Sequence, residues 1–142
     1  MRSGGPLVSR DMLVTAPASA THLGCDVVEL ERFQRVLNRN PREFLDGIFT
    51  VGEQQAAAST EAFARRFAAK EATLKALGIG LVAGIELTDI EVSAVDDGRC
   101  DVILHGAPAV LARGRRIDAR TWIETGRVSA IVWIGRAEGD LR

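Results

Sequence analysis

One long helical segment constrains the fold of this 142-residue chain more than any other feature. Residues 60–77 contain neither Gly nor Pro and span about five turns of an α-helix. Gly78 and Gly80 follow at once, where a helix commonly ends. Large apolar side chains recur on one face of the segment: Phe63, Phe67, Leu74 and Leu77. A helix with one apolar face needs a second layer to pack on, so the rest of the chain has to supply that layer.

Shorter hydrophobic patterns predict that this second layer is a β-sheet. The expected strands cover residues 22–28, 88–95, 99–104, 120–124 and 128–134. Turn signals join the second strand to the third, at Asp96-Asp97-Gly98, and the fourth to the fifth, at Thr125-Gly126. Such turns connect neighbouring antiparallel strands. The sequence therefore predicts an α+β domain with a mostly antiparallel sheet packed against the long helix.

Short helical segments account for the remaining intervals. Residues 29–38 show an amphipathic helical pattern. Pro41 suits the first turn of a following helix, and Thr50 with Glu53 forms a capping box that starts another. A last short helix is expected over residues 107–116.

The composition is that of an ordinary globular domain, with 46% hydrophobic and 26% charged residues. A net charge of -1 excludes binding modes that depend on an overall basic field, such as wholesale nucleic-acid binding. No apolar run approaches the roughly 18 residues of a membrane span, and the first twenty residues lack a signal-peptide pattern. We expect a cytoplasmic protein with a flexible extension over residues 1–20, one domain over 21–136 and a C-terminal tail over 137–142.

The cysteines and histidines show neither metal-ligand spacing nor a disulfide framework. Cys25 and Cys100 lie far apart, and we expect both to be buried small hydrophobes in a reducing compartment. His22 and His105 are equally isolated, so the sequence gives no support for a zinc site.

Three charged residues occupy unusual positions on the long helix. Glu71 and Lys75 border its apolar stripe, and Lys70 projects close to the middle of the stripe. Two interpretations are open: an ordinary i,i+4 pair with Lys70 extended to solvent, or a functional site. Asp26 is open in the same way, because with Glu29 it fits a helix capping box, whereas a strand-end carboxylate also fits a metal ligand.

A positive stripe follows the first expected helix. Arg32, Arg35 and Arg39 recur on the side opposite its apolar residues. They form either a solvated face or a docking surface for an acidic partner. Gly78 and Gly80 likewise either end a helix or let a ligand lie close to the backbone.

Several motifs occur together in an order that resembles one enzyme family. Residues 24–33 match the pattern G-x-D-(I/V)-x-E-x-x-R, and residues 49–53 match F-T-x-x-E. Residues 66–78 resemble R-F-A-A-K-E-A-x-x-K-A, and residues 89–92 read D-I-E-V. Together they resemble the holo-acyl-carrier-protein synthases, a family of 4′-phosphopantetheinyl transferases, over about residues 22–134.

The resemblance implies transfer of 4′-phosphopantetheine from coenzyme A to a carrier-protein serine, with release of adenosine 3′,5′-bisphosphate. It implies Mg²⁺ held by Asp26 and Glu71 with the coenzyme A diphosphate, and a catalytic set of Glu71, Lys75 and Asp26. Contacts to coenzyme A are expected from Lys70, Lys75, Gly78 and Gly80, and docking of an acidic acyl carrier protein on Arg32, Arg35 and Arg39. The implied fold is that of these transferases, assembled as a homotrimer with each active site at a subunit boundary.

The chain departs from the family pattern near its C-terminus. The family usually shows S-x-(S/T)-H before its final strand, and here the histidine position falls on Ile123 or Glu124. A carboxylate near the diphosphate would repel it unless Arg127 or the metal offsets that charge. The alternative hypothesis is therefore a repurposed homologue without transferase activity, which binds carrier proteins as a scaffold or acts on carrier-tethered acyl or polyketide chains.

Overall fold

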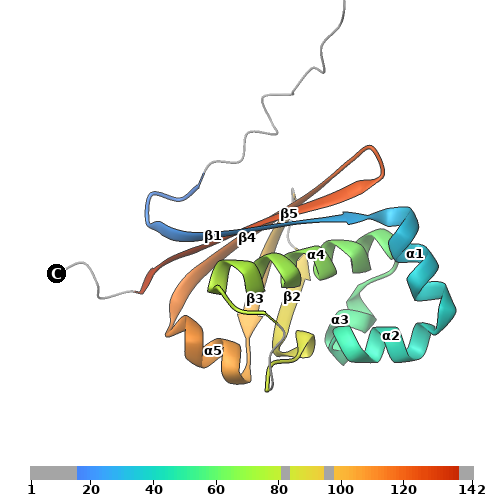
Figure 1. Cartoon of the computed structure of the whole chain (residues 1–142), viewed down its shortest axis with the longest axis horizontal. Coiled ribbons are helices and arrows are strands. Elements are labelled where there is room, and N and C mark those ends of the chain that lie inside the picture. The colour runs from blue at the N-terminus through green and yellow to red at the C-terminus, as the bar shows by residue number, and fades with distance from the viewer. Residues whose placement is uncertain (1–15, 81–83, 95–97, 138–142) are drawn as a thin grey trace, which may run out of the picture.

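Five strands form one antiparallel sheet in the order β1-β5-β4-β3-β2 (Figure 1). The computed structural model describes residues 16–80, 84–94 and 98–137. The strands are β1 Ala20–Glu29, β2 Ile90–Ala94, β3 Arg99–Leu104, β4 Arg115–Glu124 and β5 Arg127–Ala137. The prediction of an α+β fold with an antiparallel sheet packed against a long helix is confirmed.

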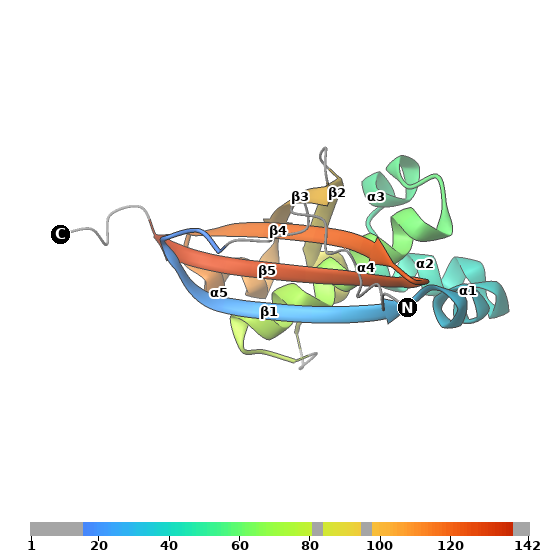
Figure 2. The ribbon, with the colours of Figure 1, turned by 90° about the horizontal axis from the view of Figure 1, so that it is seen from above.

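The helices lie on one side of this sheet (Figures 1 and 2). They are α1 Leu30–Arg39, α2 Pro41–Ile48, α3 Val51–Ala56, α4 Thr60–Leu77 and α5 Gly106–Ala112, with a short 3-10 helix at Leu87–Asp89. The helix α4 runs along the sheet and packs mainly on β1 and β5. Within the described ranges, none of these helices is both long and apolar enough to cross a membrane.

The bounds of α4 agree with the sequence prediction, but its packing face differs. Ser59 caps the first turn by accepting a hydrogen bond from the Ala62 amide, and Gly78 ends the helix with a φ of 71°. The fully buried face is rich in small residues: Ala64, Ala68, Ala69, Ala72 and Thr73. Of the predicted apolar stripe, Leu74 is buried, whereas Phe63, Phe67 and Leu77 are only partly buried. Alanines let the helix axis approach the sheet closely, so the large aromatic rings pack at its flank.

Gly24 shows how closely β1 and α4 approach each other. A Cβ at this position would lie 1.9 Å from the Ala72 carbonyl oxygen and 2.5 Å from the Ala76 nitrogen. Both obstacles are backbone atoms, so no side-chain movement relieves the clash. Glycine is therefore required here, and the contact fixes the level at which β1 crosses the helix.

Several predicted boundaries change. The strand β1 starts two residues earlier than expected, and the helix α1 starts one residue later. The helix expected over residues 107–116 ends at Ala112, because β4 begins at Arg115. The side chain of Arg115 instead donates to the Leu111 and Ala112 carbonyls, which satisfies the end of α5. The Thr125-Gly126 turn is confirmed, with φ values of 51° and 73°. Residues 95–97 of the other predicted turn lie outside the described residues.

The two cysteines behave differently. Cys100 is buried as predicted, but Cys25 is exposed, so that prediction is wrong for Cys25. Alternation along β1 explains the difference, because Gly24 faces α4 and its neighbour therefore points to the other side of the sheet. Most of the predicted extension (residues 1–15) and tail (138–142) lies outside the described residues.

Candidate functional site

Two carboxylates that are distant in the sequence meet in one cavity. Asp26 comes from β1 and Glu71 from α4, and both line a cavity of about 620 Å³. Because β1 and α4 approach each other closely at Gly24, the side chains of Asp26 and Glu71 lie near each other. Other charged residues of the lining are Glu29, Arg32 and Arg127, and its aromatic residues are Phe33, Phe44 and Phe67.

The strand position of Asp26 decides between its two open interpretations. The strand β1 continues to Glu29, which is the residue before α1, and no side chain caps the start of that helix. The helix-capping interpretation of Asp26 is therefore wrong. Its side chain is 16% exposed and faces α4, where it is available to a ligand in the cavity.

The electrostatics of the cavity favour a bound cation. Burial raises the pKa of Glu71, the nearby Asp26 carboxylate raises it further, and Lys75 partly opposes the shift. Two adjacent, partly buried carboxylates repel each other, and a cation between them removes that repulsion. The surroundings of Glu71 thus disfavour its negative charge, and a bound metal ion would stabilise that charge.

The donor set fits Mg²⁺ better than a metal held by protein ligands alone. In the part of the chain that the structure describes, no group of three or more His, Cys, Asp or Glu residues could hold a metal ion. Mg²⁺ commonly takes one or two carboxylates and completes its coordination with phosphate oxygens and water. Asp26 and Glu71 can supply those two carboxylates, and a phosphorylated substrate would supply the rest.

Lys75 pairs with Asp26 rather than with Glu71. Its ammonium group donates to Asp26 Oδ1 at 2.9 Å, and this hydrogen bond raises the pKa of Lys75. The predicted i,i+4 ion pair with Glu71 is absent among the described residues. The exposed lysine thus stands at the edge of the carboxylate pair, one turn of α4 beyond Glu71.

Lys70 belongs to the core and not to this cavity. Its ammonium group is 0% exposed and donates to Glu53 Oε1 at 2.6 Å, Ile48 O at 2.7 Å and Leu87 O at 3.0 Å. All three donors of an ammonium group are thereby used. Burial lowers the pKa of Lys70, and Glu53 opposes that shift. The expectations that Lys70 extends to solvent or contacts coenzyme A are corrected, because no donor remains for a ligand.

Glu53, the ion-pair partner of Lys70, was predicted from the sequence only as part of a local capping box. It completes the predicted capping box with Thr50, and its second oxygen accepts from the Val92 amide at 3.0 Å. Its buried carboxylate therefore joins α3, α4 and β2. The capping-box signal correctly located Glu53 but carried no information on the distant Lys70.

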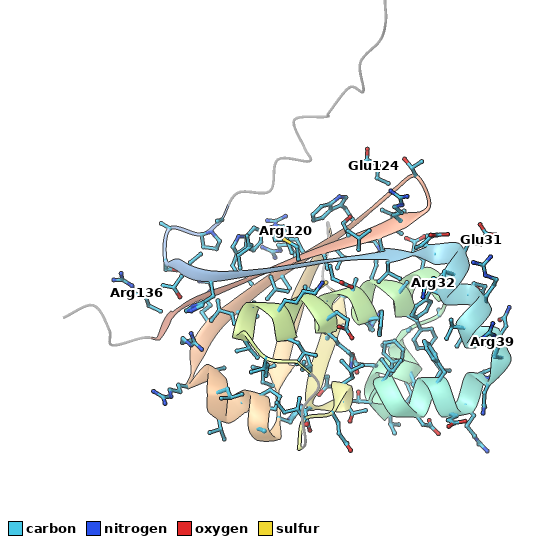
Figure 3. All side chains as sticks on the ribbon, viewed as in Figure 1. Glu31, Arg32, Arg39, Arg120, Glu124 and Arg136 are labelled. Atoms are coloured by element: carbon cyan, nitrogen blue, oxygen red, sulfur yellow. The ribbon has the colours of Figure 1, made fainter. Side chains whose placement is uncertain are left out.

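The remaining predicted site residues differ in their relation to the cavity. Arg32 lines the cavity. Arg35 and Arg39 follow it on α1 and are exposed; Figure 3 labels Arg32 and Arg39. Gly78 and Gly80 follow α4 on the side of Lys75 and have open space at the Cβ position. Their predicted contacts to coenzyme A remain predictions.

The region that departs from the family pattern forms the β4–β5 hairpin. Glu124 is exposed at its tip (Figure 3), and Ile123 is partly buried against the core. Neither residue lines the cavity, but Arg127, the first residue of β5, does. The sequence indicates no more than a charge offset for Arg127, because nothing in its spacing connects it to Asp26.

Comparisons with known proteins point to one family. The family model for the 4′-phosphopantetheinyl transferase superfamily matches residues 22–124. A holo-(acyl-carrier-protein) synthase of Verminephrobacter eiseniae is 38% identical over 100 residues, which cover 68% of this chain and 76% of the relative. A synthase of the same description from Magnetococcus marinus is 44% identical over 94 residues, which cover 61% of this chain and 68% of the relative.

Solved structures show the same architecture. The holo-(acyl-carrier-protein) synthase of Neisseria meningitidis superposes with a TM-score of 0.69 at 26% identity, over 81% of this chain and 98% of that one. The Bacillus anthracis enzyme, solved in complex with CoA (3′,5′-ADP), gives a TM-score of 0.68 at 27% identity, over 84% of this chain and 100% of that one. With the motifs around Asp26 and Glu71 and the family match over most of its length, this chain belongs to the 4′-phosphopantetheinyl transferase superfamily.

Proposed function

We propose that this protein transfers 4′-phosphopantetheine from coenzyme A to a serine hydroxyl of an apo acyl carrier protein and releases adenosine 3′,5′-bisphosphate. The convergence of Asp26 and Glu71 in one cavity is the observation that carries the proposal. Curated relatives described as holo-(acyl-carrier-protein) synthases, and the Bacillus anthracis complex with CoA, support it. We place the reaction in the cytoplasm, which agrees with the two free cysteines.

Asp26 and Glu71 would hold Mg²⁺ together with the donor diphosphate. The ion would neutralise the diphosphate and polarise the phosphoryl group that is transferred. Lys75 binds the diphosphate from the adjacent turn of α4 and stabilises the charge that develops as the nucleotide leaves. Glu71, or a water molecule that it orders, accepts the proton of the attacking serine, and its raised pKa suits that role.

The shape of the cavity suggests on which side of Glu71 each substrate binds. Lys75, Gly78 and Gly80 lie beyond Glu71 toward the C-terminal end of α4. The cavity extends from Glu71 the other way, toward Phe67, one turn earlier, and toward the α1 residues Arg32 and Phe33. We therefore assign the nucleotide to the side of Lys75 and the entry of the carrier serine to the side of α1.

Mass spectrometry tests the proposed function directly. Incubation with coenzyme A, Mg²⁺ and a set of apo carrier proteins is expected to give a phosphopantetheine adduct on one carrier serine, and chelation of the metal is expected to abolish it. Absence of an adduct with every carrier protein from the same genome contradicts the proposal.

The changed C-terminal motif favours one alternative function. A homologue without the family histidine at Ile123 or Glu124 could retain carrier docking and lose phosphoryl transfer. Carrier binding measured by calorimetry without any adduct would support such a scaffold or an enzyme that acts on carrier-tethered acyl chains. Binding together with an adduct would exclude it.

Replacement of Lys75 by Met is expected to strengthen Mg²⁺ binding and to weaken coenzyme A binding. In the free protein Lys75 pairs with Asp26, so its removal should tighten Mg²⁺ binding in the absence of coenzyme A about 2- to 5-fold, the range of an exposed ion pair. Coenzyme A should bind about 10-fold more weakly, because a charge-assisted contact to phosphate is lost. Isothermal titration calorimetry measures both affinities.

The variant Arg136→Met removes a positive charge elsewhere and serves as its control, since Arg136 is exposed at the far end of β5 (Figure 3). Equal changes in Arg136→Met would attribute the effect to net charge. Weaker Mg²⁺ binding in Lys75→Met would show that the lysine does not compete with the cation.

The outer face of the sheet supports the expected homotrimer. This face is defined by Leu23, Cys25 and Val27 of β1 with their neighbours on β5, and in the described ranges no helix lies over it (Figure 2). Leu23 is 56% and Val27 60% exposed. Exposed apolar side chains grouped on a sheet mark an interface. Because Val27 also lines the cavity, assembly through this face places each active site at a subunit boundary.

Substitution of Leu23 by Asp is expected to convert the trimer into monomers, since each subunit interface would then bury a carboxylate without a partner. Light scattering coupled to size-exclusion chromatography measures the mass. Val110→Asp is the matched control, because Val110 is 74% exposed on α5, behind the sheet. A Leu23→Asp protein that remains trimeric would exclude the outer face as the interface.

A further inference from the structure

The β4–β5 hairpin brings a second arginine to the cavity beside that of α1. The Thr125-Gly126 turn has both residues at positive φ, and the Gly126 carbonyl accepts a hydrogen bond from the Leu30 amide at 3.0 Å. The hairpin tip is thereby tied to the first residue of α1. Arg127 and Arg32, which follow on the two elements, line the same cavity.

Neither guanidinium group is engaged by the described residues of its own subunit. Arg127 lies in register with Glu29 on one neighbouring strand and with Glu124 on the other. Despite these flanking acids, the described residues form no ion pair with Arg127, and none with Arg32. Each exposed guanidinium therefore keeps a fork of donors that matches a carboxylate.

The two arginines and Lys75 lie on opposite sides of Glu71. Both line the part of the cavity that extends from Glu71 toward α1, whereas Lys75 lies one turn of α4 in the opposite direction. Phosphate contacts belong to the side of Lys75 in the reaction proposed above. Arg32 and Arg127 instead flank the path by which the serine of a protein substrate enters.

We infer that Arg127 and Arg32 form an arginine clamp that grips an acidic segment of the carrier protein next to its reactive serine. This inference rests on the proposed function and adds the β4–β5 hairpin to the docking surface of α1. Two arginines on different elements bind two faces of the segment, which orients the serine toward Glu71. The β4–β5 hairpin, which lacks the family histidine, would thus bind the carrier protein through Arg127.

The charge of the clamp also predicts how docking responds to salt. Exposed charges attract an acidic partner over about 8–10 Å at physiological ionic strength, and added salt screens this attraction. Association of the carrier should therefore slow as salt is added. In Arg127→Ala the dependence on salt should be shallower, since one of the attracting charges is gone.

Steady-state kinetics with an apo carrier protein and coenzyme A tests the clamp. Arg127→Ala is expected to raise KM for the carrier about 10-fold, the effect of losing a charge-assisted hydrogen bond, and to leave KM for coenzyme A within about 2-fold. Arg127→Lys is expected to recover only part of this loss, because an ammonium group cannot bind a carboxylate in a bidentate manner. Arg136→Ala, on the same strand, is expected to behave as the wild-type protein.

Three outcomes overturn the clamp: a larger effect of Arg127→Ala on KM for coenzyme A than for the carrier, no difference between Arg127→Ala and Arg136→Ala, or full recovery by lysine.

Calorimetric binding of the apo carrier without coenzyme A separates this inference from the proposed function. Weaker carrier binding by Arg127→Ala than by Arg136→Ala would support the clamp even if the wild-type protein formed no adduct. Unchanged carrier binding with an active wild-type enzyme would overturn the clamp alone.

Discussion

Replacement of Asp26 by Asn, or of Glu71 by Gln, is expected to lower the rate of phosphopantetheine transfer about 10²- to 10³-fold, comparable to removing one preorganised electrostatic group from an active site. Either change leaves a single carboxylate in the cavity and removes half of the charge that would hold Mg²⁺. Adduct formation followed by mass spectrometry measures the rate, and calorimetry measures the loss of Mg²⁺ affinity.

The stability of the Glu71→Gln protein distinguishes a site residue from a structural one. Burial and the Asp26 carboxylate raise the pKa of Glu71, so its negative charge costs the folded protein free energy. Removing the charge should therefore leave the melting temperature unchanged or higher in the absence of metal. Glu61→Gln is the matched control on the exposed first turn of α4. Wild-type rates in both cavity variants would show that the two carboxylates do not act in transfer.

Replacement of Lys70 by Met is expected to destabilise the protein by about 3–5 kcal/mol, the usual cost of leaving one partner of a buried ion pair alone. Glu53 would lose its buried cationic partner, and the Ile48 and Leu87 carbonyls would lose their donor. The melting temperature should fall by about 10–15 °C, which calorimetry measures.

Two further variants make this test specific. Lys75→Met makes the same substitution on the same helix at an exposed position and should change the melting temperature by no more than a few degrees. The double variant Lys70→Met with Glu53→Gln should recover part of the lost stability, because the lone buried charge is gone. A Lys70→Met protein that melts like Lys75→Met would refute the structural role of the buried pair.

Local patterns were sufficient to locate most elements. The long helix has the predicted bounds because its propensity, its Ser59 cap and its Gly78 end all act within a few residues. The Thr50 and Glu53 capping box and the Thr125-Gly126 turn were predictable for the same reason. The face of α4 that packs on the sheet was not, because hydrophobicity favours the phenylalanines, whereas the close approach of β1 at Gly24 admits only alanine-sized neighbours.

The fold class and the family motifs could be predicted from the amino-acid sequence, and the two candidate metal-binding carboxylates followed from the family resemblance. The distribution of the charged residues between core and cavity depends on the tertiary structure. Lys70 and Glu71 are adjacent in the chain, yet the helical rotation of about 100° between them sends one side chain to Glu53 in the core and the other to Asp26 in the cavity. The pairing of Lys75 with Asp26 and the presence of Arg127 in the lining likewise depend on contacts between distant segments. Periodicity describes which way a side chain points, and only packing determines what it meets there.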